Sequence, residues 1–109
     1  MADCHLVAYR KAGFNPVAIA SRSHEKAKSV AERHSIEKSY AHYSQLLDDP
    51  SIEVVDIAVP PDNQLDVICE VVKRDHIRGI LAQKPLSVNF RQASKIVQIC
   101  ADAGKTLCV

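Results

Sequence analysis

Short apolar segments alternate with amphipathic segments along the whole chain. The clearest apolar segment is residues 54–59, VVDIAV, and the pair Pro60-Pro61 ends it. Apolar residues then recur at i, i+3, i+4 and i+7, which predicts a helix whose core-facing stripe is Leu65, Ile68, Cys69 and Val72. An almost wholly apolar strand is typical of a parallel sheet covered on both faces. The alternation therefore predicts an α/β fold with a doubly wound parallel sheet.

The other segments follow the same order. Helices are expected over residues 3–12, 23–34, 42–48 and 89–103, and strands over 17–20, 36–40, 79–82 and 106–109. Ser23, Asp62 and Asn89 are expected to cap helices. Gly13, Gly79 and Gly104 each stand where a helix is followed by a strand, so all three are expected in the left-handed conformation.

Composition excludes several classes of protein. Hydrophobic residues make up 47% of the chain and charged residues 25%, with a net charge of +1, so no basic surface for nucleic acid is indicated. No apolar run is long enough for a transmembrane helix, and no signal peptide is recognised, which predicts a cytoplasmic protein. The cysteines lack the spacing of a metal site, and Cys69 and Cys100 are expected to be reduced and buried in helices.

Ligands of doubly wound sheets bind beyond the carboxyl ends of the strands. The first such end carries Ser21, Arg22 and Ser23. In dinucleotide-binding sheets this position meets the adenine ribose, where an acid would bind both hydroxyls and repel a 2′-phosphate. Arg22 can instead pair with a phosphate or lie over adenine, which predicts NADP rather than NAD. A solvated helix start with an incidental arginine is the alternative.

Two further strand ends carry candidate ligand contacts. Residues 59–63, VPPDN, form a rigid turn that would hold the backbone close to a ligand. Residues 83–85, QKP, place Lys84 where it could donate to a ribose hydroxyl or a substrate oxygen, or assist proton transfer. An ordinary strand–helix turn and a surface lysine are the alternatives.

The ordered set of these segments resembles one known family. Residues 5–13, 17–22, 46–50, 54–60 and 83–86 are similar, in this order, to segments of the Gfo/Idh/MocA oxidoreductases, named after glucose–fructose oxidoreductase and inositol dehydrogenase. Each segment is short, but the resemblance covers essentially the whole chain.

The resemblance implies a Rossmann domain that binds NAD or NADP and that is followed, in family members, by a substrate domain. Hydride passes between the nicotinamide and a sugar or polyol substrate, and the full-length enzyme could form a homo-oligomer. Lys84 matches the lysine that positions the nicotinamide ribose and the substrate, and is the candidate catalytic residue. The expected cofactor contacts are Ser21, Arg22, Ser23, Val59, Pro60, Asn63, Gln83 and Lys84, and no metal is expected.

The chain also departs from the family pattern. Gln83 replaces the family's glutamate, Pro61 an asparagine, and Gln64 a frequent histidine. No G-x-G-x-x-G loop, which would bind the pyrophosphate, occurs in the sequence. We therefore expect a partial domain, residues 1–109, that lacks the first strand, the glycine-rich loop and the substrate domain, and that is inactive alone. The sheet is expected to be incomplete, with strands 17–20 and 54–59 either directly paired or separated by an empty strand position, and not bridged by residues 1–10.

The sequence has features of two other classes of protein. A signalling receiver module has its aspartate at a strand end, whereas Asp56 is expected mid-strand. A receiver also places a full strand and helix between the aspartate strand and the strand that precedes its Lys-Pro turn, whereas Lys84 follows the very next strand. A non-enzymatic nucleotide-binding or interaction fragment is the second alternative, because the sequence lacks the phosphate loop.

Overall fold

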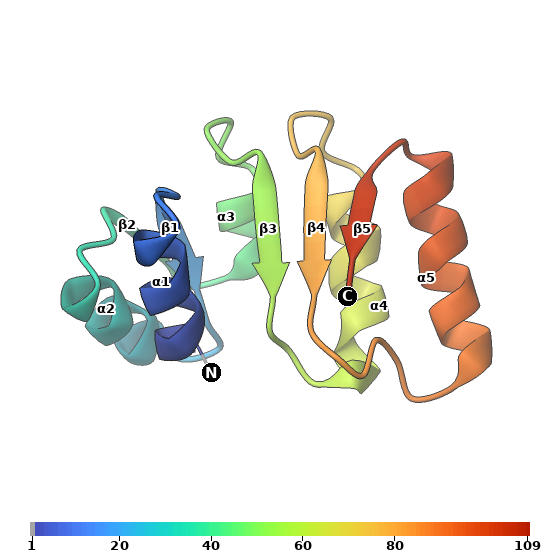
Figure 1. Ribbon diagram of the computed structural model, residues 1–109, viewed down its shortest axis with the longest axis horizontal. Coiled ribbons are helices and arrows are strands. Elements are labelled where there is room, and N and C mark those ends of the chain that lie inside the picture. The colour runs from blue at the N-terminus through green and yellow to red at the C-terminus, as the bar shows by residue number, and fades with distance from the viewer. Residues whose placement is uncertain (1) are drawn as a thin grey trace. The chain divides into compact units, whose positions relative to one another are not determined.

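A computed structural model describes residues 2–109, which divide into two units, the first ending at Asp49 and the second beginning at Pro50 (Figure 1). In the first unit the elements are α1 (Ala2–Lys11), β1 (Ala18–Ala20), α2 (His24–Arg33), β2 (Lys38–Tyr40) and α3 (Tyr43–Leu47). In the second they are β3 (Val54–Ile57), α4 (Pro61–Val71), β4 (Gly79–Ala82), α5 (Phe90–Asp102) and β5 (Thr106–Cys108). The predicted alternation of strands and helices is confirmed throughout.

The first unit contains a parallel pair of strands, β1 and β2. Its core consists of Leu6, Ala31 and Ile36, which come from α1, α2 and the segment after α2. Residues 2–11 form a helix and supply no strand, as predicted. Within the described residues of each unit, β1 pairs with β2, and β3, β4 and β5 form a separate sheet.

The end of α2 contains a left-handed residue that the sequence did not indicate. Ser35 has φ 56°, a conformation that costs an L-residue about 1–2 kcal/mol and that glycine adopts freely. Arg10 of α1 donates hydrogen bonds of 3.0 Å to the carbonyl oxygens of both His34 and Ser35. These bonds pair carbonyl groups that a helix end leaves without partners, and they fix the Ser35 backbone.

Replacing Ser35 by glycine is expected to stabilise the first unit by about 1 kcal/mol, because the side-chain strain disappears while both carbonyl acceptors remain. Urea unfolding measures this change. Ser35→Ala is the control: it removes the hydroxyl but keeps Cβ, so it should give no gain. Equal stabilisation by both variants would show that the strain is not its cause.

The second unit is a three-stranded parallel sheet in the order β3-β4-β5, and α4 and α5 contact each other beside it (Figure 1). Residues of both strands and helices make its core: Val55, Ile57, Ile68, Val71, Ile77, Ile80 and Ile96 are all buried. Exposure alternates along β3, however, and Val54 is 66% exposed. The prediction of a strand covered on both faces is therefore wrong for β3, because only one face of the strand is buried.

Helix α4 differs from its prediction in register and start. Its buried residues are Gln64, Val67, Ile68 and Val71, so the stripe lies one position away from that predicted, and only Ile68 is shared as a fully buried residue. Both sets have helical spacing, and periodicity could not choose between them. Pro60, and not Asp62, is the N-cap residue, and Asp62 lies in the first turn, where a negative charge favours the helix dipole.

The other punctuation residues were mostly predicted correctly. Gly13 and Gly104 have positive φ angles of 84° and 69°. Gly79 does not, because it is already the first residue of β4; a Cβ there would lie 3.4 Å from Val54. Asn89 caps α5, with its side-chain oxygen 2.8 Å from the backbone nitrogen of Gln92.

A buried carboxylate connects β2 with the segment after α3. Asp49 is 8% exposed and accepts hydrogen bonds of 2.9 Å from the Lys38 ammonium and from the Tyr40 hydroxyl. Lys38 and Tyr40 are two positions apart on β2, so both side chains lie on the same face of the strand. The hydrogen bonds to Asp49 are the main reason that the pKa of Lys38 and the pKa of Tyr40 are both raised.

These shifts predict a loss of stability at alkaline pH. Below about pH 10 both protons are bound in the folded and the unfolded chain, so the contribution of the cluster is complete. At higher pH the unfolded chain releases them first, and stability falls as the pH rises through the raised pKa values. Asp49→Asn should lower the Tm at neutral pH by several degrees and flatten this alkaline decline, measured by thermal unfolding from pH 7 to 11. Glu32→Gln, an exposed change on α2, should leave the decline as it is.

The cysteines agree in part with the prediction that Cys69 and Cys100 are reduced and buried. All four cysteines are free; Cys100 is buried, and burial raises the pKa of its thiol, whereas Cys69 is only half-buried. Within residues 2–109, no helix combines the length and apolar character that a membrane crossing needs.

Candidate functional site

The residues after β1 lie at the carboxyl end of a parallel strand, as predicted. Ser23 caps α2 by accepting a 3.3 Å hydrogen bond from the backbone nitrogen of Lys26, and the Ser21 hydroxyl accepts one of 3.4 Å from the backbone nitrogen of Ser23. Both hydroxyl groups act here as acceptors, so their own protons stay available for donation. Arg22 is exposed between them.

In the second unit the turns after β3 and β4 lie next to each other. The strands are parallel, with Ile57 opposite Ala82, and the Gln83 nitrogen donates a 3.1 Å hydrogen bond to the Ile57 oxygen, one residue beyond the end of β4. The backbone nitrogen of Asn63 donates to the oxygen of Pro60 at 2.9 Å, which closes the turn into α4. The structure thus brings together two of the three predicted contact segments, 59–63 and 83–85.

Lys84 is exposed in this arrangement, at the turn that ends β4. Among the described residues, no hydrogen bond or ion pair engages the side chain of Lys84, and the same is true of Arg22 in the first unit. Each cation is therefore available to bind an anion or a hydroxyl oxygen without first breaking an internal contact.

Gln83 has a partner that explains its departure from the family pattern. Its side-chain nitrogen lies 3.3 Å from a carboxylate oxygen of Asp56, which is exposed on β3. A glutamate at position 83 would place a second carboxylate against Asp56, and like charges at this distance repel each other. An amide donor at position 83 therefore suits an aspartate at position 56.

Gln64, which the sequence marked only as the replacement of a frequent family histidine, makes contacts that were not predicted. It is 1% exposed, and its side-chain nitrogen donates to the carbonyl oxygens of Gln83, at 2.5 Å, and Pro85, at 3.2 Å. Its side-chain oxygen is buried and has no partner among the residues that the structure describes, an arrangement that costs about 1–3 kcal/mol. One signal was present in the sequence: Gln64 is the polar member of a second apolar series with helical spacing, together with Val67, Ile68 and Val71.

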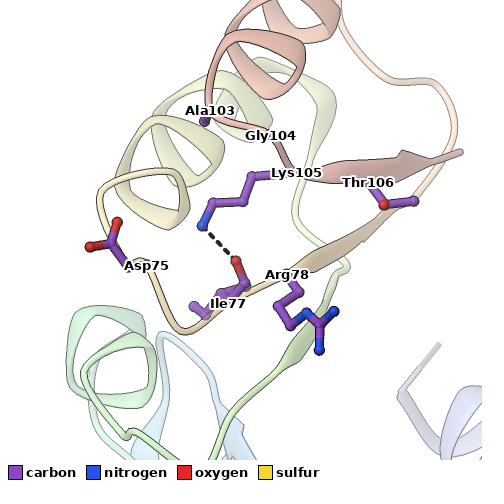
Figure 2. Close-up of a pocket in the computed structure, with 7 residues that line it drawn as sticks. All are labelled: Asp75, Ile77, Arg78, Ala103, Gly104, Lys105 and Thr106. Carbon is purple, nitrogen blue, oxygen red and sulfur yellow. Dashed lines mark hydrogen bonds between the residues drawn. The ribbon is translucent and has the colours of Figure 1, made fainter.

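A pocket lies at the other end of the strands of this sheet. It has a volume of about 280 Å³ and is lined by Asp75, Ile77, Arg78, Ala103, Gly104, Lys105 and Thr106 (Figure 2). The Lys105 ammonium donates hydrogen bonds of 2.7 Å and 2.6 Å to the carbonyl oxygens of Arg74 and Ile77. Gly79 and Thr106 begin β4 and β5, so the pocket is at the amino ends of the strands, away from the turns that carry Lys84. Lys105 acts there as a structural donor to the segment after α4.

Comparison with known proteins decides what kind of domain this is. A family model described as an oxidoreductase family with an NAD-binding Rossmann fold matches residues 1–109. The chain belongs to the Gfo/Idh/MocA oxidoreductase family. The resemblance seen in the sequence is thus confirmed, as is the Rossmann-type α/β fold, and the receiver module is excluded as an alternative.

Individual relatives agree with this assignment. The chain is 36% identical over 81 residues to the trans-1,2-dihydrobenzene-1,2-diol dehydrogenase of Xenopus tropicalis, covering 74% of this chain and 24% of the relative. It is 33% identical over 90 residues to a D-xylose 1-dehydrogenase (NADP(+)) of Haloferax volcanii, covering 83% of this chain and 27% of the relative.

A solved structure shows the same fold. The NAD binding oxidoreductase from Klebsiella pneumoniae superposes with a TM-score of 0.87 at 27% identity, over 96% of this chain and 30% of that chain. The chain thus spans about a quarter of the length of the curated relatives and somewhat more of this structure.

Proposed function

We propose that this chain is the cofactor-binding part of an NAD(P)-dependent oxidoreductase that transfers hydride between nicotinamide and a sugar- or polyol-like substrate. The observation that carries the proposal is Lys84, which is exposed on a turn at the carboxyl end of β4 and has no partner among residues 2–109, in a chain that belongs to an oxidoreductase family. Two relatives are named as dehydrogenases of a cyclic diol and of D-xylose, which supports a hydroxylated carbon compound as the substrate class.

The residues would divide the work between the two ends of the dinucleotide. The nicotinamide supplies or accepts the hydride when it is bound. In the second unit, the backbone of Val59 and Pro60 would lie against the cofactor, and the side chains of Asn63 and Gln83 would offer amide donors. The Lys84 ammonium would donate to a ribose hydroxyl or to the substrate oxygen, where it would stabilise negative charge as a carbonyl or alkoxide forms.

In the first unit, Ser21, Arg22 and Ser23 would contact the adenosine half of the cofactor. An exposed guanidinium without an internal partner, and no acid in this turn, favour a 2′-phosphate over a free ribose hydroxyl. We therefore propose NADP as the preferred cofactor.

This preference can be tested on the chain with halves of the cofactor. Adenosine 2′,5′-bisphosphate should bind about tenfold more tightly than 5′-AMP, the effect of one charge-assisted hydrogen bond, measured by NMR titration at millimolar ligand. Arg22→Ala should abolish the difference, because the bound phosphate loses its counter-charge. Lys28→Ala, an exposed cation further along α2, is the control and should keep it. Tighter binding of 5′-AMP, or an unchanged preference in Arg22→Ala, would refute NADP selection by Arg22.

The reaction class is tested in the enzyme that carries this domain together with a substrate domain. Oxidation of aldoses, inositols or cyclic diols should produce reduced nicotinamide, followed by its absorbance. Failure with every hydroxylated substrate, despite bound cofactor, would contradict the proposed substrate class.

A further inference from the structure

One buried side chain holds both sides of the turn that carries Lys84. The amide nitrogen of Gln64 donates to the carbonyl oxygens of Gln83 and Pro85, the residues immediately before and after Lys84. Gln64 lies on the first turns of α4, and its side chain is almost completely buried. The backbone on either side of Lys84 is thereby tied to one helix through a single amide group.

The oxygen of the same amide has no partner within the described part of the chain. A buried acceptor without a donor lowers stability, and an apolar side chain of similar size would avoid this cost within α4, but it would also take away the donor of the Gln83 and Pro85 carbonyl oxygens. Stability of the helix therefore does not explain a glutamine at this position. What the amide adds is a pair of donors directed at the Lys84 turn.

We propose that Gln64 is a positioning residue for Lys84: by holding the carbonyls of Gln83 and Pro85, it fixes the direction in which Lys84 leaves the turn. The inference rests on the proposed function, in which Lys84 contacts the nicotinamide half of the cofactor. Gln64 itself touches neither cofactor nor substrate and acts through the backbone of the turn.

The test uses the full chain, labelled for NMR, with reduced nicotinamide mononucleotide as the probe of the Lys84 turn. Gln64→Leu keeps the length of the side chain and removes the donors; Gln64→His restores one N–H donor. Gln98→Leu is the matched control, because Gln98 is an exposed glutamine on α5 whose amide donates a hydrogen bond to Asp102 on its own helix. Two quantities are measured. The first is the rate of hydrogen exchange of the Lys84 and Leu86 backbone amides without ligand, and the second is the affinity of the probe, obtained from the change of the Lys84 NMR signals during titration.

We expect Gln64→Leu to speed exchange in the turn and to weaken the probe about tenfold, because a turn that is no longer held in place must be ordered when the probe binds. Gln64→His should recover part of both effects, and Gln98→Leu should show neither. Binding of adenosine 2′,5′-bisphosphate at the first unit should stay unchanged in all variants. If Gln64→Leu unfolds the second unit, which would be seen as loss of the β4 signals, exchange and probe affinity are compared in Gln64→His, Gln64→Asn and the unchanged chain instead.

Other outcomes overturn the inference. Unchanged exchange in Gln64→Leu would show that the amide does not hold the turn. Faster exchange with unchanged probe affinity would show that Gln64 is structural only. If the probe does not shift the NMR signals of Lys84 even in the unchanged chain, the proposed role of Lys84 fails, and the positioning role fails with it. The exchange data would still show whether Gln64 holds the turn.

Discussion

Replacing Lys84 by alanine is expected to lower turnover by at least about a hundredfold in the active enzyme that carries this domain, the lower range for a group that assists proton transfer. Hydride transfer changes the charge on the substrate oxygen, and a fixed cation near that oxygen stabilises the transition state more than the ground state. Lys84 has the exposure for this role, and its turn is tied to α4 through Gln64. Steady-state kinetics with saturating cofactor measures the change.

Two comparisons make the result specific. Lys95→Ala removes an exposed lysine from the middle of α5 and should leave turnover unchanged. Lys84→Arg keeps the charge but changes the donor geometry, so it should retain more activity than Lys84→Ala. Unchanged turnover in Lys84→Ala would return Lys84 to the class of ordinary surface lysines.

The sequence predicted the fold because its local signals agree with one another. Ser23 and Asn89 each combine a capping side chain with a following amphipathic segment, and Gly13 and Gly104 end helices as expected. Errors arose where local pattern does not determine burial. The apolar composition of residues 54–59 suggested burial on both faces, but exposure of Val54 depends on which helices cover the sheet, and this is a property of the packed unit.

The sequence predicted where the candidate site residues lie in the fold, but not which residues they contact. Strand ends located Arg22 and Lys84 because ligands of parallel sheets bind there. Gln64 and Asp49 each contact residues of other elements. No rule of residue spacing predicts such contacts. A glutamine in an apolar stripe, or an aspartate before a proline, has too many ordinary explanations for its partner to be named from sequence.

The sequence contains no glycine-rich loop for the pyrophosphate that joins the two halves of the cofactor. Residues 1–109 contain no G-x-G-x-x-G, and α1 starts at Ala2. The first N–H groups of a helix lack intrahelical partners, and a glycine loop that leads into them lets the backbone approach a phosphate. We therefore propose that the 109-residue chain binds NADPH weakly and catalyses no hydride transfer by itself.

Placing a β-strand and a glycine-rich loop from a relative before residue 1 is expected to raise NADPH affinity at least about a hundredfold, because two charge-assisted hydrogen bonds of about 1.5–3 kcal/mol each suffice for this change. Calorimetric titration of both proteins measures it. An extension of equal length, in which alanines replace the loop glycines, separates the effect of phosphate binding from that of completing the sheet. That control should gain stability but little affinity, since Cβ atoms keep the backbone away from the pyrophosphate. Micromolar NADPH binding by the unextended chain would contradict the prediction, because Arg22 and Lys84 would then suffice without the loop.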